Sequence, residues 1–306
     1  MKKFVVSALV AVFALLPLAA QNQVILRYDY AGFKGVEISG DFKLSYVPSD
    51  SYSVKLTVDK LLEEYTKAYV RNGVLHIFVD SKALTPEMKK AFKGRNAIIP
   101  VLEAEVTAPT LEELYMGDNV SLKSGTELKG RQILINMSGN AKAEDFKLAA
   151  GKAKLVLGGA ASVKADIAAD SLSLSASGNS NAEIKNRSRL FLARTTGASD
   201  VVLEGSTLKY QIESESNTRI SLSGTADTLA VKAGGTCKVS AKALAVKISD
   251  LTLFGNAKCN INATESLKLD MSGRSSVIYG GKPAIEIVKI VSSTVTRQCD
   301  EEQEKW

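Results

Sequence analysis

The sequence predicts an all-β protein folded as a parallel β-helix, a single-stranded solenoid whose turns, called rungs below, each span about 19–20 residues. Two observations predict this fold. Apolar and polar residues alternate on both sides of a short Ser-Gly-Asn corner, as in residues 172–184, and such alternation is typical of β-strands. The corner also returns at a nearly constant spacing. This repeat is too short for a propeller blade and too rich in Ser, Thr and Val for a helical repeat.

Each corner is marked by a residue that we expect to take a positive φ, and this residue is nearly always glycine. Asn or Asp often follows it, as at Asp41, Asn140 and Asn179, and we expect these side chains to stack from rung to rung. The expected structural corners are Gly40, Gly117, Gly139, Gly159, Gly178, Gly197, Ser216, Gly235, Gly255 and Gly273.

Residues at fixed distances from the corner predict which side chains face the interior. The positions four before and four after it are apolar, as at Leu174 and Ala182, and we expect both columns to point inward. Two residues after the corner only small side chains occur, which predicts a tight interior. The next position is polar, and we expect it to face water. Its members include Asn181, Asp200 and Arg219, which we consider possible ligand contacts.

The three cysteines are Cys237, Cys259 and Cys299. Cys237 and Cys259 fall in inward columns of adjacent rungs, but two residues apart in register. Strand geometry then separates them by about 8 Å, beyond the reach of an unstrained disulfide. We therefore expect both to be buried thiols. Metal binding is not expected, because no His or carboxylate column stands beside them.

The chain divides into five expected segments. Residues 1–20 combine Lys2-Lys3, a short apolar run and small residues before Gln21, which predicts a secretory signal peptide, with a retained N-terminal anchor as the alternative. Residues 21–47 contain the first rung, with Val36, Ile38, Phe42, Leu44 and Tyr46 inward. Residues 48–110 form irregular rungs and a cap, residues 111–281 the regular rungs, and residues 282–306 a closing strand and a polar tail.

Residues 48–110 interrupt the repeat. Short helices are expected at 59–67 and 85–92, strands at 53–58 and 97–107, and a tight turn at Asn72-Gly73 within 70–80. This segment either caps the end of the solenoid or carries a ligand site. It holds most of the bulky candidates for exposure, which are Tyr52, Tyr65, Tyr69, His76, Phe78 and Phe92. We select Tyr65 and Tyr69 as possible ligand contacts, because aromatic faces stack on sugars or anchor protein partners.

Little in the sequence indicates catalysis. The single histidine, His76, has no partner motif for a nucleophilic triad, and the outward columns bring no carboxylate pair together. We therefore expect no catalytic residues, no metal and no cofactor. The net charge of +6 is spread through mixed Lys and Glu positions, and this pattern argues against nucleic-acid binding.

Three features carry a resemblance to a known family. They are the opening Val-Glu-Ile-Ser-Gly-Asp-Phe at 36–42, the stretch 101–114 that leads into Gly117-Asp118-Asn119, and the repeated Ser-Gly-Asn-Ala corners. The chain resembles the head GIN domain (DUF2807) family of autotransporter adhesin-like proteins from Bacteroidetes-type bacteria. The resemblance covers nearly all the mature chain. It implies a right-handed parallel β-helix in an exported protein, without known catalytic residues.

Two classes of function follow from these patterns. The first is an exported, non-enzymatic β-helix protein of the cell envelope that binds a glycan or a protein in the manner of an adhesin. The alternative is a polysaccharide-active enzyme, a lyase or glycosidase, on the same scaffold. The mature chain is expected to have no transmembrane segment and to be periplasmic, outer-membrane-associated or secreted. The sequence leaves the ligand and the oligomeric state open.

Overall fold

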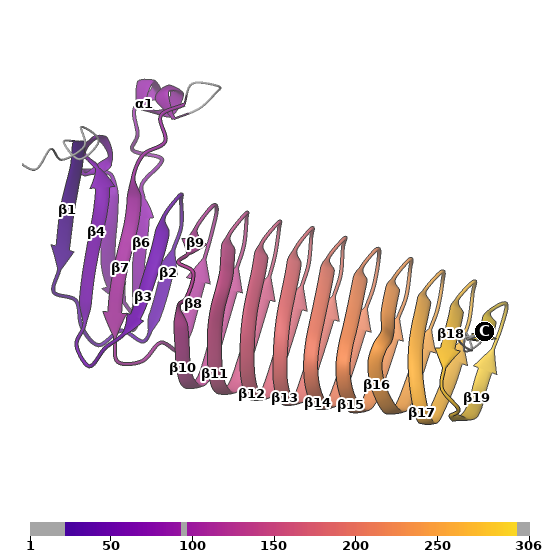
Figure 1. The fold of residues 1–306 in the computed structure, drawn as a ribbon. Helices are drawn as coiled ribbons and strands as arrows, with labels where there is room; N and C mark the ends of the chain where they lie inside the picture. Colours follow the sequence, from indigo (N-terminus) through magenta and orange to yellow (C-terminus); the bar gives the residue numbers. More distant parts are fainter. Residues whose placement is uncertain (1–21, 93–96, 299–306) are drawn as a thin grey trace, which may run out of the picture.

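The structure is a computed structural model that describes residues 22–92 and 97–298. It is 4% helical and forms a β-solenoid of about 10 turns with a single sheet (Figure 1). The predicted parallel β-helix is therefore confirmed. The expected signal peptide, Gly94 at the end of the second expected helix, and Cys299 with the residues after it lie outside the described residues.

The regular rungs are long strands that each pair in parallel with the next strand along the chain. Each ribbon bends near its middle, so that a rung has two faces (Figure 1). The post-corner face contains the first halves of these strands, and the pre-corner face contains their second halves. The strands are β10 (Glu127–Met137), β11 (Lys142–Leu157), β12 (Ser162–Ala176), β13 (Asn181–Thr195), β14 (Asp200–Ser214), β15 (Arg219–Ala233), β16 (Lys238–Leu253) and β17 (Lys258–Met271).

The core lies between the two faces and is filled by the columns predicted to point inward. Every member of the two apolar columns is buried, from Ile135 to Leu269 before the corner and from Ala143 to Val277 after it. The column of small residues is buried too, and its polar members bond within it, as when Ser180 Oγ donates to Ser199 Oγ at 3.3 Å. Cys237 and Cys259 are free, buried thiols, as expected, and burial raises the pKa of the Cys259 thiol to about 12.

The corners share one backbone conformation. A positive φ occurs at Gly40, Gly139, Gly159, Gly178, Gly197, Ser216, Gly235, Gly255 and Gly273. At the second expected corner, however, Asp118 takes it (φ 55°) and Gly117 does not, so the corner lies one residue later than the sequence pattern suggested. Asp118 Oδ2 there accepts from Gly40 N at 3.0 Å. Ser292 (φ 52°) adds a corner beyond Gly273 that the sequence analysis did not identify.

Side chains that follow the corner stack over the first rungs and again where Thr236 Oγ1 donates to Asn217 Oδ1 at 3.4 Å. Asn119 Nδ2 donates to Asp41 Oδ1 at 2.6 Å, and Asn140 Nδ2 donates to Asn119 Oδ1 at 2.9 Å. Beyond Asn140 the same column contains Ala160 and Ala198, which cannot continue the amide contacts.

The first rungs are not stacked in the order of the sequence. Strands β2 (Gly35–Ile38) and β3 (Lys43–Pro48) form a rung that lies between two others: β6 (Val74–Val79) and β7 (Leu102–Ala108) on one side, and β8 (Glu113–Met116) and β9 (Ser121–Leu122) on the other. The second rung in space, β2 and β3, therefore comes earlier in the sequence than the first rung, β6 and β7. Strands β8 and β9 then lead into the regular stack.

Three further strands, two of them reversed, close this end of the solenoid (Figure 1). Strand β4 (Ser53–Asp59) runs antiparallel to β7, and β1 (Gln23–Tyr28) runs antiparallel to β4. On the pre-corner face, β5 (Thr66–Arg71) runs antiparallel to β6. Parallel stacking therefore stops at β6 and β7.

The local sequence signals in residues 48–110 predicted most of the helices and strands, but some of these begin or end at other residues than expected. The expected helix over 59–67 is a single 3₁₀ turn, Lys60–Leu62, because β5 begins at Thr66; Asp59 Oδ1 accepts from Leu61 N as its cap. Asn72 and Gly73 form the β5–β6 turn, with φ of 52° and 75°. Helix α1 (Pro86–Ala91) is capped by Thr85, whereas β7 begins at Leu102 rather than at residue 97.

The other end of the solenoid contains β18 (Ser276–Gly280), β19 (Ala284–Ile290) and β20 (Thr294–Arg297). Strand β19 lies where a closing strand was expected and pairs with β17, but β20 follows it. Strand β20 pairs with β18 and was not expected, because its four residues are too short and polar to predict a strand.

Candidate functional site

An outward-facing group of side chains lies on the pre-corner face near the N-terminal end of the solenoid. The group, called the aromatic strip below, consists of Tyr69, His76, Phe78, Glu37 and Tyr115. In register, Tyr69 of β5 lies opposite His76 of β6, His76 beside Glu37 of β2, and Glu37 beside Tyr115 of β8. Strands far apart in the sequence thus place these side chains in one row.

Strand alternation turns these side chains outward. The positions between them, Leu75 and Ile77 of β6, Val36 and Ile38 of β2, and Leu114 and Met116 of β8, are buried in the core. Because successive residues of a strand point to opposite faces, the neighbours of these core residues must face solvent. The core pattern of three adjacent strands therefore determines the strip.

Aromatic contacts order one end of the strip. The rings of Tyr69 and His76 are stacked, with centroids 4.9 Å apart and an interplanar angle of 25°. Phe78 meets the Tyr69 ring edge-on at 6.1 Å and 90°. Tyr69 remains 41% exposed. A ring fixed by two neighbours but open to solvent presents a flat apolar surface at low entropic cost.

Polar groups continue the strip toward the regular rungs. His76 Nδ1 lies 3.1 Å from Glu37 Oε2. Tyr115 Oη donates to Glu113 Oε2 at 3.0 Å. Burial, the hydrogen bond to Glu113 and the negative charges of Glu113 and Glu37 all raise the pKa of Tyr115. Tyr115 therefore stays protonated, which suits a hydrogen-bond donor better than a base.

A shallow hollow of about 370 Å³ borders Tyr115. Its lining includes Glu37, Asn136 and Ser138, together with the corner residues Asp118 and Gly139. Asn136 is the register partner of Tyr115 on β10. The hollow thus places carboxylate, amide and hydroxyl groups beside an aromatic ring, the combination that binds a polar ligand with apolar faces.

A second hollow, of about 630 Å³, lies between the first corners and the α1 segment. Leu62, Leu84, Phe92 and Ile98 form much of its lining, and Asp41 is among its polar residues. No residue of α1 itself is buried.

The structure separates the residues that the sequence suggested as ligand contacts. Tyr69 lies in the strip, whereas Tyr65 is half-buried just before β5. Asn181, Asp200 and Arg219 are register partners on consecutive rungs, but on the post-corner face of the regular stack. The two sets therefore do not form one surface.

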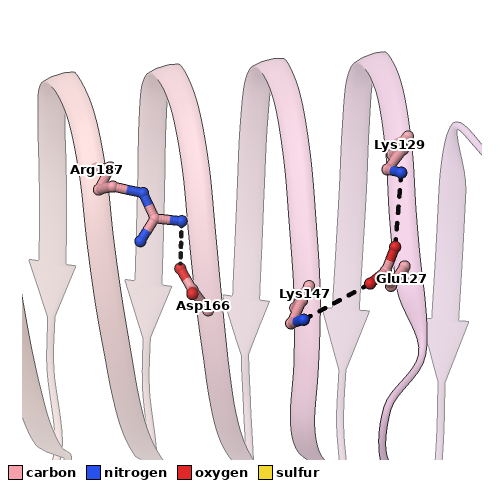
Figure 2. Close-up of polar contacts among 5 residues, drawn as sticks. All are labelled: Glu127, Lys129, Lys147, Asp166 and Arg187. Carbon is pink, nitrogen blue, oxygen red and sulfur yellow. Dashed lines mark ion pairs between the residues drawn. The ribbon is translucent and has the colours of Figure 1, made fainter.

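The post-corner face also has a row of alternating charge that crosses five rungs. Its register partners are Glu127, Lys147, Asp166, Lys185 and Glu204. Figure 2 shows its first part, where Lys147 Nζ and Lys129 Nζ lie 3.7 and 3.5 Å from Glu127, and Arg187 lies 2.9 Å from Asp166 Oδ1. Because the charges alternate, the row carries little net charge. A shift of the pairing register would place like charges opposite each other, so the alternation also disfavours such a shift.

The sequence analysis missed Glu37, Tyr115 and Asn136. Each stands at an outward position of an alternating run, so the alternation signalled its exposure. What the sequence did not reveal is that β2 lies between β6 and β8, which brings residues 37, 76 and 115 side by side.

Two general features of the described residues bear on function. In residues 22–92 and 97–298, no three His, Cys, Asp or Glu side chains are grouped so that they could hold a metal ion. In the same part of the chain, no helix has the length and hydrophobicity to cross a membrane.

The fold defines a β-solenoid protein, and the aromatic strip lies on its outer surface. A family model described as "Putative auto-transporter adhesin, head GIN domain" (DUF2807) matches residues 32–188 and 172–283. The chain belongs to this family. The family resemblance that the sequence motifs indicated is therefore confirmed.

Three solved structures of similar fold come from Parabacteroides species. A putative adhesin from Parabacteroides distasonis matches with 19% identity and a TM-score of 0.51, over 90% of this chain and 97% of that chain. A putative adhesin from Parabacteroides merdae matches with 18% identity and a TM-score of 0.47, over 91% and 97% of the two chains. A putative lipid binding protein from Parabacteroides distasonis matches with 17% identity and a TM-score of 0.47, over 91% and 98%. No curated protein matches the sequence.

Proposed function

We propose that this chain is an exported, non-enzymatic protein of the cell envelope that binds a glycan through the aromatic strip, in the manner of an adhesin. The observation that carries the proposal is the exposed Tyr69 ring, stacked on His76 and continued by Glu37 and Tyr115 in one row. Sugar rings combine apolar faces with hydroxyl groups, so they match a surface that offers aromatic rings beside hydrogen-bonding groups.

Two further observations support this proposal. The family is described as adhesin-like, and the N-terminal segment 1–20 has the pattern of a signal peptide. We place the mature chain in the periplasm, at the outer membrane or outside the cell. Its partner is then an envelope or extracellular glycan; a protein partner is the competing outcome, and no nucleic-acid partner is expected.

The test compares Tyr69→Ala combined with Tyr115→Ala against Phe254→Ala. Phe254 is an exposed corner aromatic on a distant rung, so it controls for the loss of aromatic surface. We expect the double variant to lose glycan-array binding at least about tenfold, because each ring contact contributes roughly 1 kcal/mol. Phe254→Ala should bind as the parent chain does. Unchanged binding in the double variant, at an unchanged melting temperature, would contradict the assignment.

A polysaccharide-active enzyme is the second candidate, and the pairing of His76 with Glu37 favours it, since this pair lies beside Tyr115. The raised pKa of Tyr115 argues against a tyrosinate base at neutral pH. Incubation of the chain with glycans that it binds separates the two functions. New reducing ends or unsaturated sugars, lost in His76→Ala, would establish the enzyme and refute the non-enzymatic proposal.

A further inference from the structure

The C-terminal end of the solenoid differs from the N-terminal end. Within the described residues, β19 pairs only with β17 and β20 only with β18, so the outer edges of both strands carry unpaired backbone groups. Large apolar side chains are exposed on the same rung, including Ile285 (43%), Ile287 (60%) and Ile290 (36%). An edge that is both apolar and unpaired is a template for pairing with another strand.

The N-terminal end is built differently in the described part of the chain. Strands β1, β4 and β5 lie outside the last parallel rung; β4 and β5 run against its direction, whereas β1 runs with it, and Phe33 and Leu62 are buried. In a head-to-tail stack of copies, β19 would meet the reversed strand β5, so the parallel pairing of the pre-corner face would not continue from copy to copy. The bare end is therefore better matched by another copy of itself than by the opposite end of a copy.

A bulge determines which side chains of β19 face inward. Ile285 and Ile287 lie over the core residues Leu267 and Leu269, but the register then shifts at Val288. After the shift, Lys289 lies over Asp270 and Ile290 over the core residue Met271. Ile285 and Ile290 thus both face inward.

The same register turns two charges outward. Glu286 lies over Lys268, 3.0 Å from Lys268 Nζ, and Lys289 lies over Asp270. Lys268 and Asp270 flank the buried Leu269 and alternate with it. Glu286 and Lys289 are three positions apart, which in a regular strand would place them on opposite faces. They nevertheless share the outer surface, because the bulge adds one residue between them.

This arrangement makes β19 complementary to itself. If two copies of the strand run antiparallel about a two-fold axis between Ile287 and Val288, Glu286 of one faces Lys289 of the other. In the same register Ile285 faces Ile290, Ile287 faces Val288, and Ala284 faces Val291. Opposite charges meet on the outer surface and isoleucines meet over the core, which are favourable cross-strand pairs.

We propose that two copies of this chain associate end to end through β19, as a two-fold symmetric dimer with an antiparallel β19–β19 pair. A two-fold axis through the last rung pairs β20 with its copy in the same way, so both faces of the sheet continue from one protomer into the other. The dimer covers the exposed isoleucines and leaves the two capped ends, each with its aromatic strip, pointing outward. This geometry rests on β19 alone and is independent of the proposed function.

Charge exchange tests the pairing. The chain from residue 21 to residue 306 is compared by sedimentation velocity over a concentration series with Glu286→Lys, with Lys289→Glu and with the variant that carries both. The two-fold axis makes the pair between Glu286 and Lys289 occur twice at the interface, so each single change replaces two attractive pairs by two repulsive ones. It should raise the dimer dissociation constant roughly tenfold or more. The combined variant restores opposite charges across the axis and should dimerise as the parent chain does.

A matched control uses Glu215→Lys, the same change at an exposed corner residue far from β19; it should leave the dissociation constant unchanged. A monomeric parent chain, insensitivity to the single changes, or assembly beyond the dimer would each overturn the proposal. So would a dimer that forms only after removal of residues 299–306, because that segment would then be the occupant of the edge.

Discussion

The corner glycines bend the chain where another residue would be strained. At Gly178 (φ 74°) an added Cβ would lie 2.6 Å from the carbonyl oxygen of Gly159 in the preceding rung. At Gly178 the backbone of the preceding rung therefore leaves no room for a side chain. Ser216 takes the same conformation without glycine (φ 75°), which shows that the column tolerates an occasional exception.

A substitution pair measures this constraint. Gly178→Val should lower the free energy of unfolding by about 3 kcal/mol, through the left-handed conformation and the collision with Gly159. Asn181→Ala, on the outer surface, should change it by less than about 0.5 kcal/mol. Ser216→Gly should give a small gain of about 0.5 kcal/mol, since relief of strain exceeds the added entropy of the unfolded chain. Equal urea midpoints for Gly178→Val and Asn181→Ala would contradict this account.

Some core residues depend on glycines that do not belong to the corner. Gly205 and Gly224 are register partners with a positive φ in the middle of β14 and β15. An added Cβ at either would collide with the carbonyl oxygen of the preceding rung. Nearby, Tyr210 is completely buried and its Oη accepts from Asn186 Nδ2 at 3.4 Å. These glycines and Tyr210 were not identified from the sequence, because strand alternation predicts which side of the sheet a residue faces but not how much room it has there.

At the scale of elements, the α1 segment is an insertion into a corner. Strands β2 and β3 are joined by the short corner 39–42, whereas β6 and β7, in the same register, are joined by residues 80–101. Helix α1 has no buried residue. The parallel pairing of β6 and β7 with β2 and β3 does not involve the insertion, so we assign the end closure mainly to β1, β4 and β5.

A graft separates the insertion from the cap. Replacing residues 78–102 by the Ser-Gly-Asp-Phe corner of residues 39–42 should preserve cooperative unfolding and the β-sheet circular dichroism. The expected loss is about 1–2 kcal/mol, because Leu62 loses apolar cover. Loss of cooperative unfolding in the graft would show that the insertion itself is an essential part of the cap.

At the scale of the molecule, each rung contacts only its neighbours, so stability should vary along the axis. The central rungs have a partner on both sides, the N-terminal end is covered by β1, β4 and β5, and β19 is exposed along its whole length. The two ends should therefore open with different free energies.

Hydrogen exchange of dilute monomer should resolve this gradient. We expect the slowest amide exchange in β12 to β16, faster exchange in β6 and β7, and the fastest in β18 to β20. The reason is that opening a terminal rung exposes one interface, while opening a central rung exposes two. Uniform protection along the axis would mean that the solenoid unfolds as one cooperative unit.

The sequence by itself determined the solenoid. The corner repeat, the strand alternation and the column of small residues are local or periodic signals, and they located the core from Ile135 to Val277, the buried Cys237 and Cys259, and the outward row that contains Asn181, Asp200 and Arg219. Each was predictable because neighbouring rungs repeat the same environment, so one rung specifies the next.

Only the tertiary structure decided how the ends are built and which outward residues share a surface. Tyr69, His76, Glu37 and Tyr115 form one strip because β2 lies between β6 and β8, and no local pattern encodes an order of stacking that departs from chain order. The corner at Asp118 in place of Gly117 and the bulge at Val288 likewise depend on the neighbouring rung. Alternation determines which way a side chain points, but pairing between distant strands determines what lies beside it.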